Sequence, residues 1–378
     1  THNVGRATDL LDQARVSGPI TEIIEESEAF PSALPVKRDA NHAAWVTIQI
    51  GCDNSCAFCI VPAVRGKEIS RPYSELVSEV EQLALTGVTE ITLLGQNVNS
   101  YGRDLTLKLR GAELTPESSQ LVGDKWVEGP HTARPLFSDL LCSVAAVSGI
   151  RRVRYTSPHP KDFRPETITA MAQIPEVCEH LHLPLQSGSD KILSAMHRGY
   201  TADRYIQKVT AARDEIPDLA LSTDIIVGFP GETDLDFERT LEVAAEVKFD
   251  NAYTFVYSPR PGTEAAESSE QVVEAKTSAD RMERLRKVIQ RTSLKGNESR
   301  VGREEEVIVE GHSKRDKKML TGRTRHNRLV HFPADRVIRP GSYAQVRVVE
   351  ARTFNLVGEL VEVTAGAKHR TRIPVVSS

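Results

Sequence analysis

The sequence predicts an α/β chain in which an incomplete barrel of six strand–helix units precedes a small all-β barrel. Two observations lead to this prediction. From Trp45 to about Pro261, short apolar runs alternate with amphipathic helical stretches, which is the order that builds a parallel sheet covered by helices. From about residue 300 onward, short alternating strands separated by glycine and proline turns take over.

The segment before the barrel, residues 1–44, is too polar to form a core of its own. A short helical pattern in THNVGRATDLLDQAR is followed by a polar stretch that several prolines interrupt. We therefore expect a short helix and then a linker.

Six candidate strands mark the barrel: WVTIQIG, EITLLGQN, VRYTS, HLHLPL, TDIIVGF and AYTFVY. Helices are expected between them, in SELVSEVEQLALTG, LFSDLLCSVAAVSG, SDKILSAM, TADRYIQKVTAARDE and TDLDFERTLEVAAEV. Six units suit an open barrel rather than a closed eight-stranded one, and chemistry in such folds lies at the C-terminal ends of the strands. Residues 103–134 interrupt the repeat, and their polar, aperiodic sequence indicates a surface insertion.

The part of the chain after the barrel has two sections. Residues 264–298 are expected to form a polar loop and then a charged helix with a single apolar face. The strands of the small barrel follow, in EEEVIVEG, MLTGRT, RLVHF, YAQVRVVEA and NLVGELVEV.

The composition is that of an ordinary globular protein, because 39% of the 378 residues are hydrophobic and 26% are charged. No apolar run approaches the ~18–20 residues of a membrane span, and the N-terminus has no signal-peptide pattern. We expect a cytoplasmic protein without a membrane partner.

A nucleic-acid partner is not visible in the net charge of −4 and would need a local basic patch. The small barrel offers one basic cluster: Lys314, Arg315, Lys317, Lys318, Arg323, Arg325 and Arg328. From charge alone, a solvated loop explains this cluster as well as phosphate binding does.

Three of the five cysteines, Cys52, Cys56 and Cys59, form a C-x3-C-x2-C motif directly after the first candidate strand. Three thiolates on one loop can bind three corners of a four-iron cluster, whereas a ferredoxin supplies four cysteines. No fourth cysteine lies nearby in the sequence, so one iron would stay open to chelate a small molecule. There are two alternatives. In one, the three cysteines bind zinc together with His42, and in the other they are unrelated thiols.

The other two cysteines stand alone. Cys142 lies in an apolar helical run and is expected in the core. Cys178 lies beside Glu176 and Glu179, which predicts a normal or raised thiol pKa and an unreactive side chain.

The cysteine motif with Phe58 before its last cysteine, placed after the first strand of an incomplete barrel, resembles the radical S-adenosylmethionine superfamily. Further segments resemble its methylthiotransferase branch: CIVPAVRGKEISRP, LLGQNVNSYG, YTSPHP, HLPLQSGSDKIL, DIIVGFPGET and YSPRPGTEA. Within that branch, GQNVNSYG and GRTRHNRLVHF are most similar to the MiaB type, which methylthiolates C2 of N6-isopentenyladenosine next to the tRNA anticodon. The small barrel resembles the TRAM domain, an RNA-binding module.

The resemblance implies that the cysteine motif holds a [4Fe-4S] cluster, whose open iron binds S-adenosyl-L-methionine and generates a 5′-deoxyadenosyl radical. It also implies RNA contacts for the basic cluster. Cofactor-binding positions are implied at three strand ends: Gly95, Gln96 and Asn97, then Gln186, Ser187 and Gly188, then Gly228 and Glu232. A strand-ending turn, a helix N-cap and a rigid strand-to-helix turn are the respective structural alternatives.

The resemblance also implies a domain order. Residues 1–44 would be the tail of an N-terminal methylthiotransferase domain plus a linker, and 45–295 the radical SAM domain with its insertion at about 103–134. Residues 296–365 would be the TRAM domain and 366–378 a C-terminal tail.

Full-length members carry a second [4Fe-4S] cluster on three cysteines of their N-terminal domain, and here no cysteine precedes Cys52. We therefore expect a truncated chain that generates radicals and binds RNA but does not complete methylthiolation. The implied partners are a tRNA carrying isopentenyladenosine, a low-potential electron donor and a sulfur source, and the chain is expected to be a monomer.

Two other functions remain open from the sequence. A non-catalytic RNA-binding protein with a structural zinc loop would hold zinc and leave S-adenosylmethionine intact. A radical enzyme acting on a protein side chain would yield a modified peptide instead of a modified nucleoside.

Overall fold

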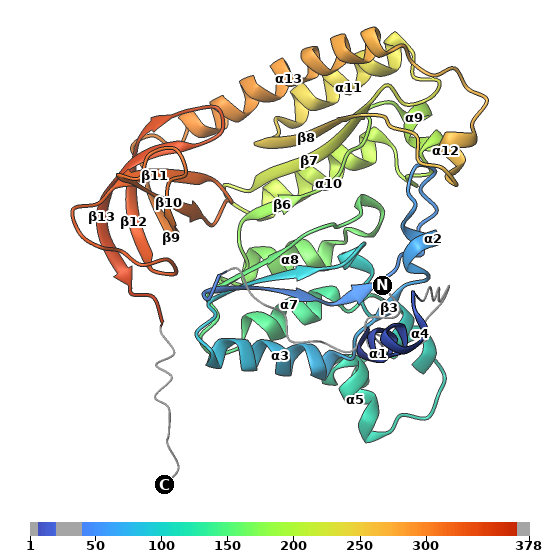
Figure 1. Ribbon diagram of the computed structural model, residues 1–378, viewed down its shortest axis with the longest axis horizontal. Helices are drawn as coiled ribbons and strands as arrows, with labels where there is room; N and C mark the ends of the chain where they lie inside the picture. The colour runs from blue at the N-terminus through green and yellow to red at the C-terminus, as the bar shows by residue number, and fades with distance from the viewer. Residues whose placement is uncertain (1–6, 20–39, 369–378) are drawn as a thin grey trace.

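The barrel predicted from the sequence is present in the computed structural model, which describes residues 7–19 and 40–368 (Figure 1). Six parallel strands build it: β1 (Ala43–Thr47), β4 (Glu90–Leu94), β5 (Arg152–Tyr155), β6 (His180–His182), β7 (Ala220–Val227) and β8 (Asn251–Val256). They form two sheets, in the orders β1-β4-β5 and β6-β7-β8. A parallel bridge between Val153 and Val177 joins the two sheets, which leaves β1 and β8 as the edges of an open barrel.

Helices cover the outside of this barrel: α3 (Tyr73–Leu85), α7 (Phe137–Ala145), α8 (Pro165–Gln173), α10 (Ala202–Glu215) and α11 (Asp234–Val247). Alternate strand residues such as Val46, Ile91 and Ile225 are fully buried in the core that these helices share with the sheets. The residues between them face the interior of the barrel, because successive side chains of a strand point to opposite faces.

Short elements follow the C-terminal ends of the barrel strands. β2 (Gln49–Ile50) and β3 (Ile69–Ser70) pair antiparallel and flank the cysteine motif together with α2 (Val61–Arg65). Further short helices follow the later strands: η2 (Val98–Ser100), η3 (Pro160–Asp162), α9 (Asp190–Ala195) and α12 (Glu264–Glu267).

The insertion at 103–134 differs from the expected aperiodic surface loop. It contains three helices: α4 (Arg103–Leu109), α5 (Pro116–Val122) and α6 (Asp124–Val127). Leu105, Val122 and Trp126 are buried in the main core, and the Trp126 indole donates a hydrogen bond to the carbonyl of Thr132. Because each helix is only one or two turns long, its few apolar residues form no recognisable period in the sequence.

The long charged helix and the small barrel were both predicted correctly. α13 (Ala275–Glu298) packs against α11, β8 and the small barrel (Figure 1). The small barrel closes in the order β10-β11-β13-β12-β9, with bounds β9 (Glu304–His312), β10 (Met319–Thr324), β11 (Leu329–Pro333), β12 (Tyr343–Ala351) and β13 (Leu356–Ala365). Val307, Phe332 and Val346 lie in its separate apolar core.

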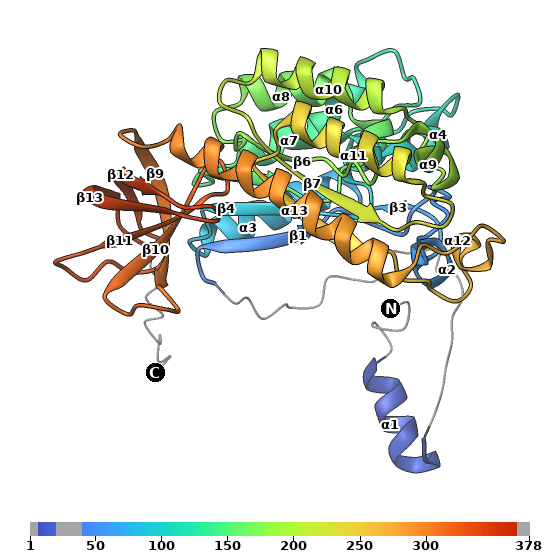
Figure 2. The same cartoon turned by 90° about the horizontal axis from the view of Figure 1, so that it is seen from above.

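The two ends of the described chain lie outside these barrels. The predicted N-terminal helix is present as α1 (Ala7–Ser17) and stands apart from the main body (Figure 2). Most of the expected linker, residues 18–42, and most of the expected C-terminal tail fall outside the described residues. Within those described residues, no helix combines the length and apolar character that crossing a membrane requires.

Candidate functional site

The three motif cysteines lie on one loop at the C-terminal ends of the barrel strands. Gly51 begins the loop with φ 73°, and a Cβ there would stand 1.9 Å from the carbonyl oxygen of Lys67, so only glycine fits. The Cys52 amide donates to the carbonyl of Gly66 at 3.2 Å. The β2–β3 pair therefore fixes where the loop leaves the sheet.

Cys52, Cys56 and Cys59 all line one cavity of about 340 Å³. The other lining residues come from the loops after several strands and include Phe58, Gly95, Gln96, Ser157, His159, His182, Gln186, Arg198 and Asp224. This arrangement brings the cysteine motif together with two of the three predicted strand ends.

Cys52 and Cys56 differ in their electrostatic surroundings. Burial raises the pKa of Cys52 to about 11, with smaller contributions from its neighbours. Cys56 instead accepts a hydrogen bond from Nη1 of Arg198 at 3.2 Å. That guanidinium is buried and is also bonded to the hydroxyl of Tyr200 at 3.2 Å, so a permanent positive charge is fixed beside one thiol.

The donor set of this cavity fits a cluster held by three thiolates with one open side. Three cysteines face the same space, and the buried Oε1 of Gln96 and Nε2 of His159 have no hydrogen-bond partner among the described residues. Such polar atoms are available to a ligand. In the described parts of the chain, no three His, Cys, Asp or Glu side chains are gathered as ligands of a single metal ion.

The strand end at Gly95–Asn97 lies directly against the cavity. A Cβ at Gly95 would approach Cγ of Gln49 to 2.8 Å, so the chain is closely packed here. Gln96 lines the cavity, whereas Asn97 is buried behind it and donates from Nδ2 to Asp162 at 2.7 Å. Of the three predicted residues, Gly95 and Gln96 line the cavity and Asn97 does not.

Gln186 lines the cavity in an unusual conformation. It has φ 67°, in the left-handed region that non-glycine residues seldom adopt, and hydrogen bonds to β7 hold it there. Residues held in such strained conformations cluster at functional sites.

The other predicted cofactor positions lie behind the cavity wall. Ser187 is fully buried, with its hydroxyl 3.3 Å from that of Thr240, and a Cβ at Gly188 would meet Cα of Thr240 at 2.6 Å. Gly188 therefore allows α11 to pack closely. The N-cap of α9 is Ser189, whose hydroxyl accepts from the amide of Ile192.

Glu232 is buried at the turn after β7. Its carboxylate accepts hydrogen bonds from the Gly228 amide and from Arg281, both at 2.7 Å. These contacts tie the turn to α13, and neither Gly228 nor Glu232 lines the cysteine cavity.

The two isolated cysteines behave differently from each other. Cys178 is buried, and its thiol pKa is raised, which agrees with the expected direction, although the cause is burial and not the neighbouring glutamates. Cys142 is exposed, so the expectation of a core position is wrong. It lies on α7, whose other side carries the buried residues Leu140, Leu141 and Val144.

The seven basic residues of the small barrel separate into two groups. Lys314, Arg315, Lys317 and Lys318 are exposed on the loop between β9 and β10. The other three form ion pairs with carboxylates, namely Arg323 with Glu310, Arg325 with Glu179 and Arg328 with Asp250. Two of these three pairs connect the small barrel to the large one.

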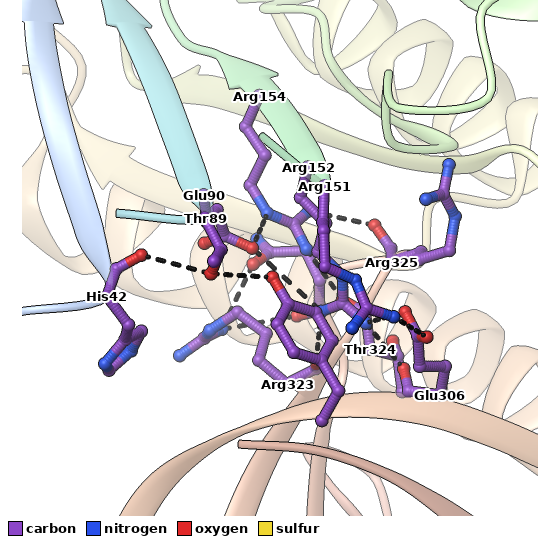
Figure 3. A network of polar contacts seen from close by, with 12 residues as sticks. His42, Thr89, Glu90, Arg151, Arg152, Arg154, Glu306, Arg323, Thr324 and Arg325 are labelled. Atoms are coloured by element: carbon purple, nitrogen blue, oxygen red, sulfur yellow. Dashed lines mark hydrogen bonds and ion pairs between the residues drawn. The ribbon is translucent and has the colours of Figure 1, made fainter. Parts of the chain in front are cut away.

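Arginines of β5 continue this connection (Figure 3). Arg152 is fully buried and donates to the carbonyls of Arg323 at 2.8 Å and Glu306 at 2.9 Å. Arg154 donates to the carbonyl of Thr324 at 2.8 Å. The small barrel is therefore fastened to the amino-terminal ends of the strands, opposite the cysteine cavity.

A second, larger cavity of about 880 Å³ occupies the barrel interior and reaches the small barrel. It shares Ser157, His182 and Asp224 with the cysteine cavity, so the two are adjacent. Trp45 of β1 and Tyr253 of β8 also line it. Sequence reasoning missed Trp45, Tyr253 and Arg198, although strand alternation identifies Trp45 and Tyr253 as interior-facing.

Comparison with known families agrees with this geometry. Residues 46–244 match the radical SAM superfamily, and residues 298–361 match the TRAM domain. The chain belongs to the radical SAM superfamily, whose members use a [4Fe-4S] cluster and S-adenosylmethionine.

Sequence relatives narrow the assignment. The chain is 44% identical over 366 residues to tRNA-2-methylthio-N(6)-dimethylallyladenosine synthase 1 of Mycobacterium marinum, covering 95% of this chain and 66% of that protein. It is 45% identical over 365 residues to the synthase of the same name from Thermobifida fusca, covering 95% and 68%. Within the superfamily, it is a member of the family that these synthases form, and it spans about two thirds of their length.

A solved structure with a similar chain path is that of coproporphyrinogen III oxidase from Escherichia coli. Its TM-score is 0.44 at 12% identity, over 80% of this chain and 66% of that one.

Proposed function

We propose that this chain is the radical-generating and RNA-binding part of an enzyme that methylthiolates C2 of N6-isopentenyladenosine next to the anticodon of tRNA. The observation that carries the proposal is the cavity onto which all three motif cysteines open. The family membership, the TRAM match and the names of the relatives support the substrate.

Cys52, Cys56 and Cys59 would hold a [4Fe-4S] cluster, and this cluster would supply the electron that cleaves S-adenosylmethionine to methionine and a 5′-deoxyadenosyl radical. The residues of the chain orient the reactants and limit access of water. Gln96 offers a buried carbonyl acceptor for a ligand amino group, and Arg198 holds Cys56 through a charge-assisted hydrogen bond.

The wall behind the cavity keeps this geometry rigid. Asp162 accepts hydrogen bonds from Asn97 and from Arg103, at 2.7 and 2.6 Å, and these bonds lower its carboxyl pKa although burial alone would raise it. Asn97 is thus a positioning residue for the adjacent Gln96. Ser187, Gly188, Gly228 and Glu232 act in the same indirect way, by fixing the loops after β6 and β7.

The finer parts of the reaction belong to the same proposal. The substrate is a tRNA that carries isopentenyladenosine, a low-potential donor reduces the cluster, and a separate sulfur source is consumed. In the whole protein a second [4Fe-4S] cluster completes the reaction, and we assign it to no residue of this chain. We propose a cytoplasmic monomer.

The test starts from anaerobically reconstituted protein. We expect about four irons and four sulfides per chain, and 5′-deoxyadenosine when S-adenosylmethionine and a strong reductant are added. Cys56→Ala should abolish both, whereas Cys142→Ala, which removes an exposed cysteine of α7, should change neither.

Two results would contradict the proposal. Colourless protein that holds zinc and leaves S-adenosylmethionine intact would favour an RNA-binding protein with a structural zinc loop. Radical formation followed by modification of a peptide, and not of tRNA, would retain the radical chemistry and refute the substrate.

A further inference from the structure

Three large aromatic side chains are exposed around the 880 Å³ cavity. Trp45 is 67% exposed, Tyr253 is 53% exposed and Phe354 is 67% exposed, and all three line this cavity. Aromatic side chains are normally buried on average, and clustered exposed ones mark binding surfaces. The volume lies within the roughly 300–1,000 Å³ typical of ligand sites.

The positions of these side chains follow from the open barrel. β1 and β8 are its edge strands, and Trp45 and Tyr253 lie on them at positions that face the interior. The neighbours Ala44 and Val46 face the core instead and are buried. Phe354 comes from the turn between β12 and β13 of the small barrel, so the aromatic residues flank the open side from both domains.

Tyr253 is held at the boundary with the cysteine cavity. Its ring meets that of His182 edge-on, with centroids 5.9 Å apart at 68°. His182 is fixed in turn, because its Nδ1 lies 3.0 Å from the hydroxyl of Ser222 and its Nε2 lies 3.4 Å from Asp224. Since His182 and Asp224 also line the cysteine cavity, a ligand on Tyr253 would lie next to the proposed reaction site.

The charges of the large cavity favour neutral ring systems over phosphates. Its arginines are each paired with a carboxylate that lines the same cavity: Arg154 with Glu90, Arg323 with Glu310 and Arg328 with Asp250. Phosphate binding depends on an excess of positive charge, whereas bases need aromatic faces and hydrogen-bonding groups. The four exposed members of the basic cluster, Lys314, Arg315, Lys317 and Lys318, lie instead on the β9–β10 loop.

We propose that Trp45, Tyr253 and Phe354 form a stacking site for unpaired bases of an RNA loop, which enter the barrel through its open side. This inference rests on the proposed function in that the ligand is RNA. It adds the residues that select an unpaired loop over a duplex, since only bases outside a helix expose both faces for stacking.

The two tryptophans of the chain provide the test. Trp126 is only 2% exposed, so the variant Trp126→Phe leaves Trp45 as the sole indole reporter. We would titrate the reconstituted full chain with an RNA hairpin that has an unpaired loop, and with a blunt duplex of the same stem. We expect the hairpin to quench the emission of Trp45 and to block its quenching by acrylamide, and the duplex to do neither.

A second readout is the RNA affinity of protein that keeps both tryptophans. It tests the inference even if Trp126→Phe does not fold. Tyr253→Ala and Phe354→Ala should each weaken hairpin binding by roughly 5- to 150-fold, corresponding to about 1–3 kcal/mol per stacked base. Duplex binding should stay unchanged. Leu235→Ala on α11, which removes an exposed apolar side chain outside the cavity, should affect neither RNA.

Specific outcomes overturn the inference. One is tight hairpin binding that leaves Trp45 emission unchanged and tolerates both alanine variants. Another is quenching that depends on protein concentration without RNA, which would assign the cavity to a second copy of the chain. The assay needs no turnover, so a protein that stacks the hairpin but leaves S-adenosylmethionine intact would refute the radical chemistry and leave the stacking site standing.

Discussion

The contact between Arg198 and Cys56 places a permanent positive charge beside one of the three thiols proposed to hold the cluster. The guanidinium is buried, and the pKa of Arg198 is raised because Tyr200 and Cys56 outweigh the effect of burial, which alone would lower it. Hydrogen bonds and charges at the sulfurs are among the factors that set the reduction potential of such clusters. Arg198 is therefore a candidate positioning and tuning residue.

Arg198→Met should shift the midpoint potential of the reconstituted cluster to a more negative value. The positive charge stabilises the reduced, more negative state, so removing it makes reduction harder. A redox titration followed by electron paramagnetic resonance measures the shift. Arg204→Met, which removes an exposed arginine of α10, is the matched control. An unchanged potential in Arg198→Met protein with a full cluster would exclude this role.

The three cysteines of the site could be predicted from the sequence, whereas Arg198 could not, for a physical reason. Cys52, Cys56 and Cys59 are neighbours along the chain, so their common cavity could be expected from spacing. Arg198 is 142 residues from Cys56 and meets it only because the chain after α9 folds back over the cysteine loop. Such a contact leaves no local signal in a single sequence.

Among the elements, β5 has a double role. Its buried positions complete the first sheet, and its arginines fasten the small barrel to the large one (Figure 3). Arg152 donates to two carbonyls and to the carboxylate of Glu306 at 3.0 Å. A buried guanidinium bonded to backbone carbonyls fixes orientation, because those acceptors cannot move independently of the strands that carry them.

Arg152→Met should loosen the attachment of the small barrel. Two carbonyls lose their donor at about 1–3 kcal/mol each, so we expect a loss of roughly 2–6 kcal/mol in unfolding free energy. Urea unfolding followed by circular dichroism measures the loss. Arg347→Met, which removes an exposed ion pair with Glu304 within the small barrel, should cost about 0–1 kcal/mol. Equal stability of the two variants would show that the attachment does not depend on Arg152.

Elements with long regular patterns were predictable, and short ones were not. The six barrel strands, the five strands of the small barrel and α13 all occur where their periodicity places them. α8, the β2–β3 pair and the helices of the insertion were missed. In the insertion, Trp126 becomes buried only through packing against the rest of the core, which overrides a polar local sequence.

In the whole molecule, the cysteine cavity and the basic loop of the small barrel lie far apart. The cysteine cavity lies at the C-terminal ends of the strands, and the small barrel is attached at their other ends (Figure 1). The exposed basic side chains of the β9–β10 loop are therefore distant from the cluster site. We expect them to bind the RNA backbone, while the barrel interior receives the bases.

The double variant Lys317→Ala/Lys318→Ala should weaken binding of hairpin and duplex RNA alike. Log affinity falls with log salt, and each lost phosphate contact makes this negative slope shallower by roughly 0.7 to 0.9, so the pair should make it shallower by about 1.4 to 1.8. Fluorescence anisotropy at several salt concentrations measures the slope. The same double alanine change at Lys276 and Lys287 of α13 is the control for net charge. A slope that becomes shallower to the same extent in both double variants would assign the effect to general charge.

The length of α13 sets a fixed distance between the small barrel and the cysteine cavity. This helix has 24 residues and packs against β8 at the large barrel and against β12 at the small one. At about 1.5 Å per residue it is roughly 36 Å long and cannot stretch without breaking its hydrogen bonds. Under the proposed function, α13 would hold the RNA contacts of the small barrel at a fixed distance from the cysteine cavity. We therefore expect a nucleotide that lies at a different distance from those contacts to escape reaction, whatever its chemistry.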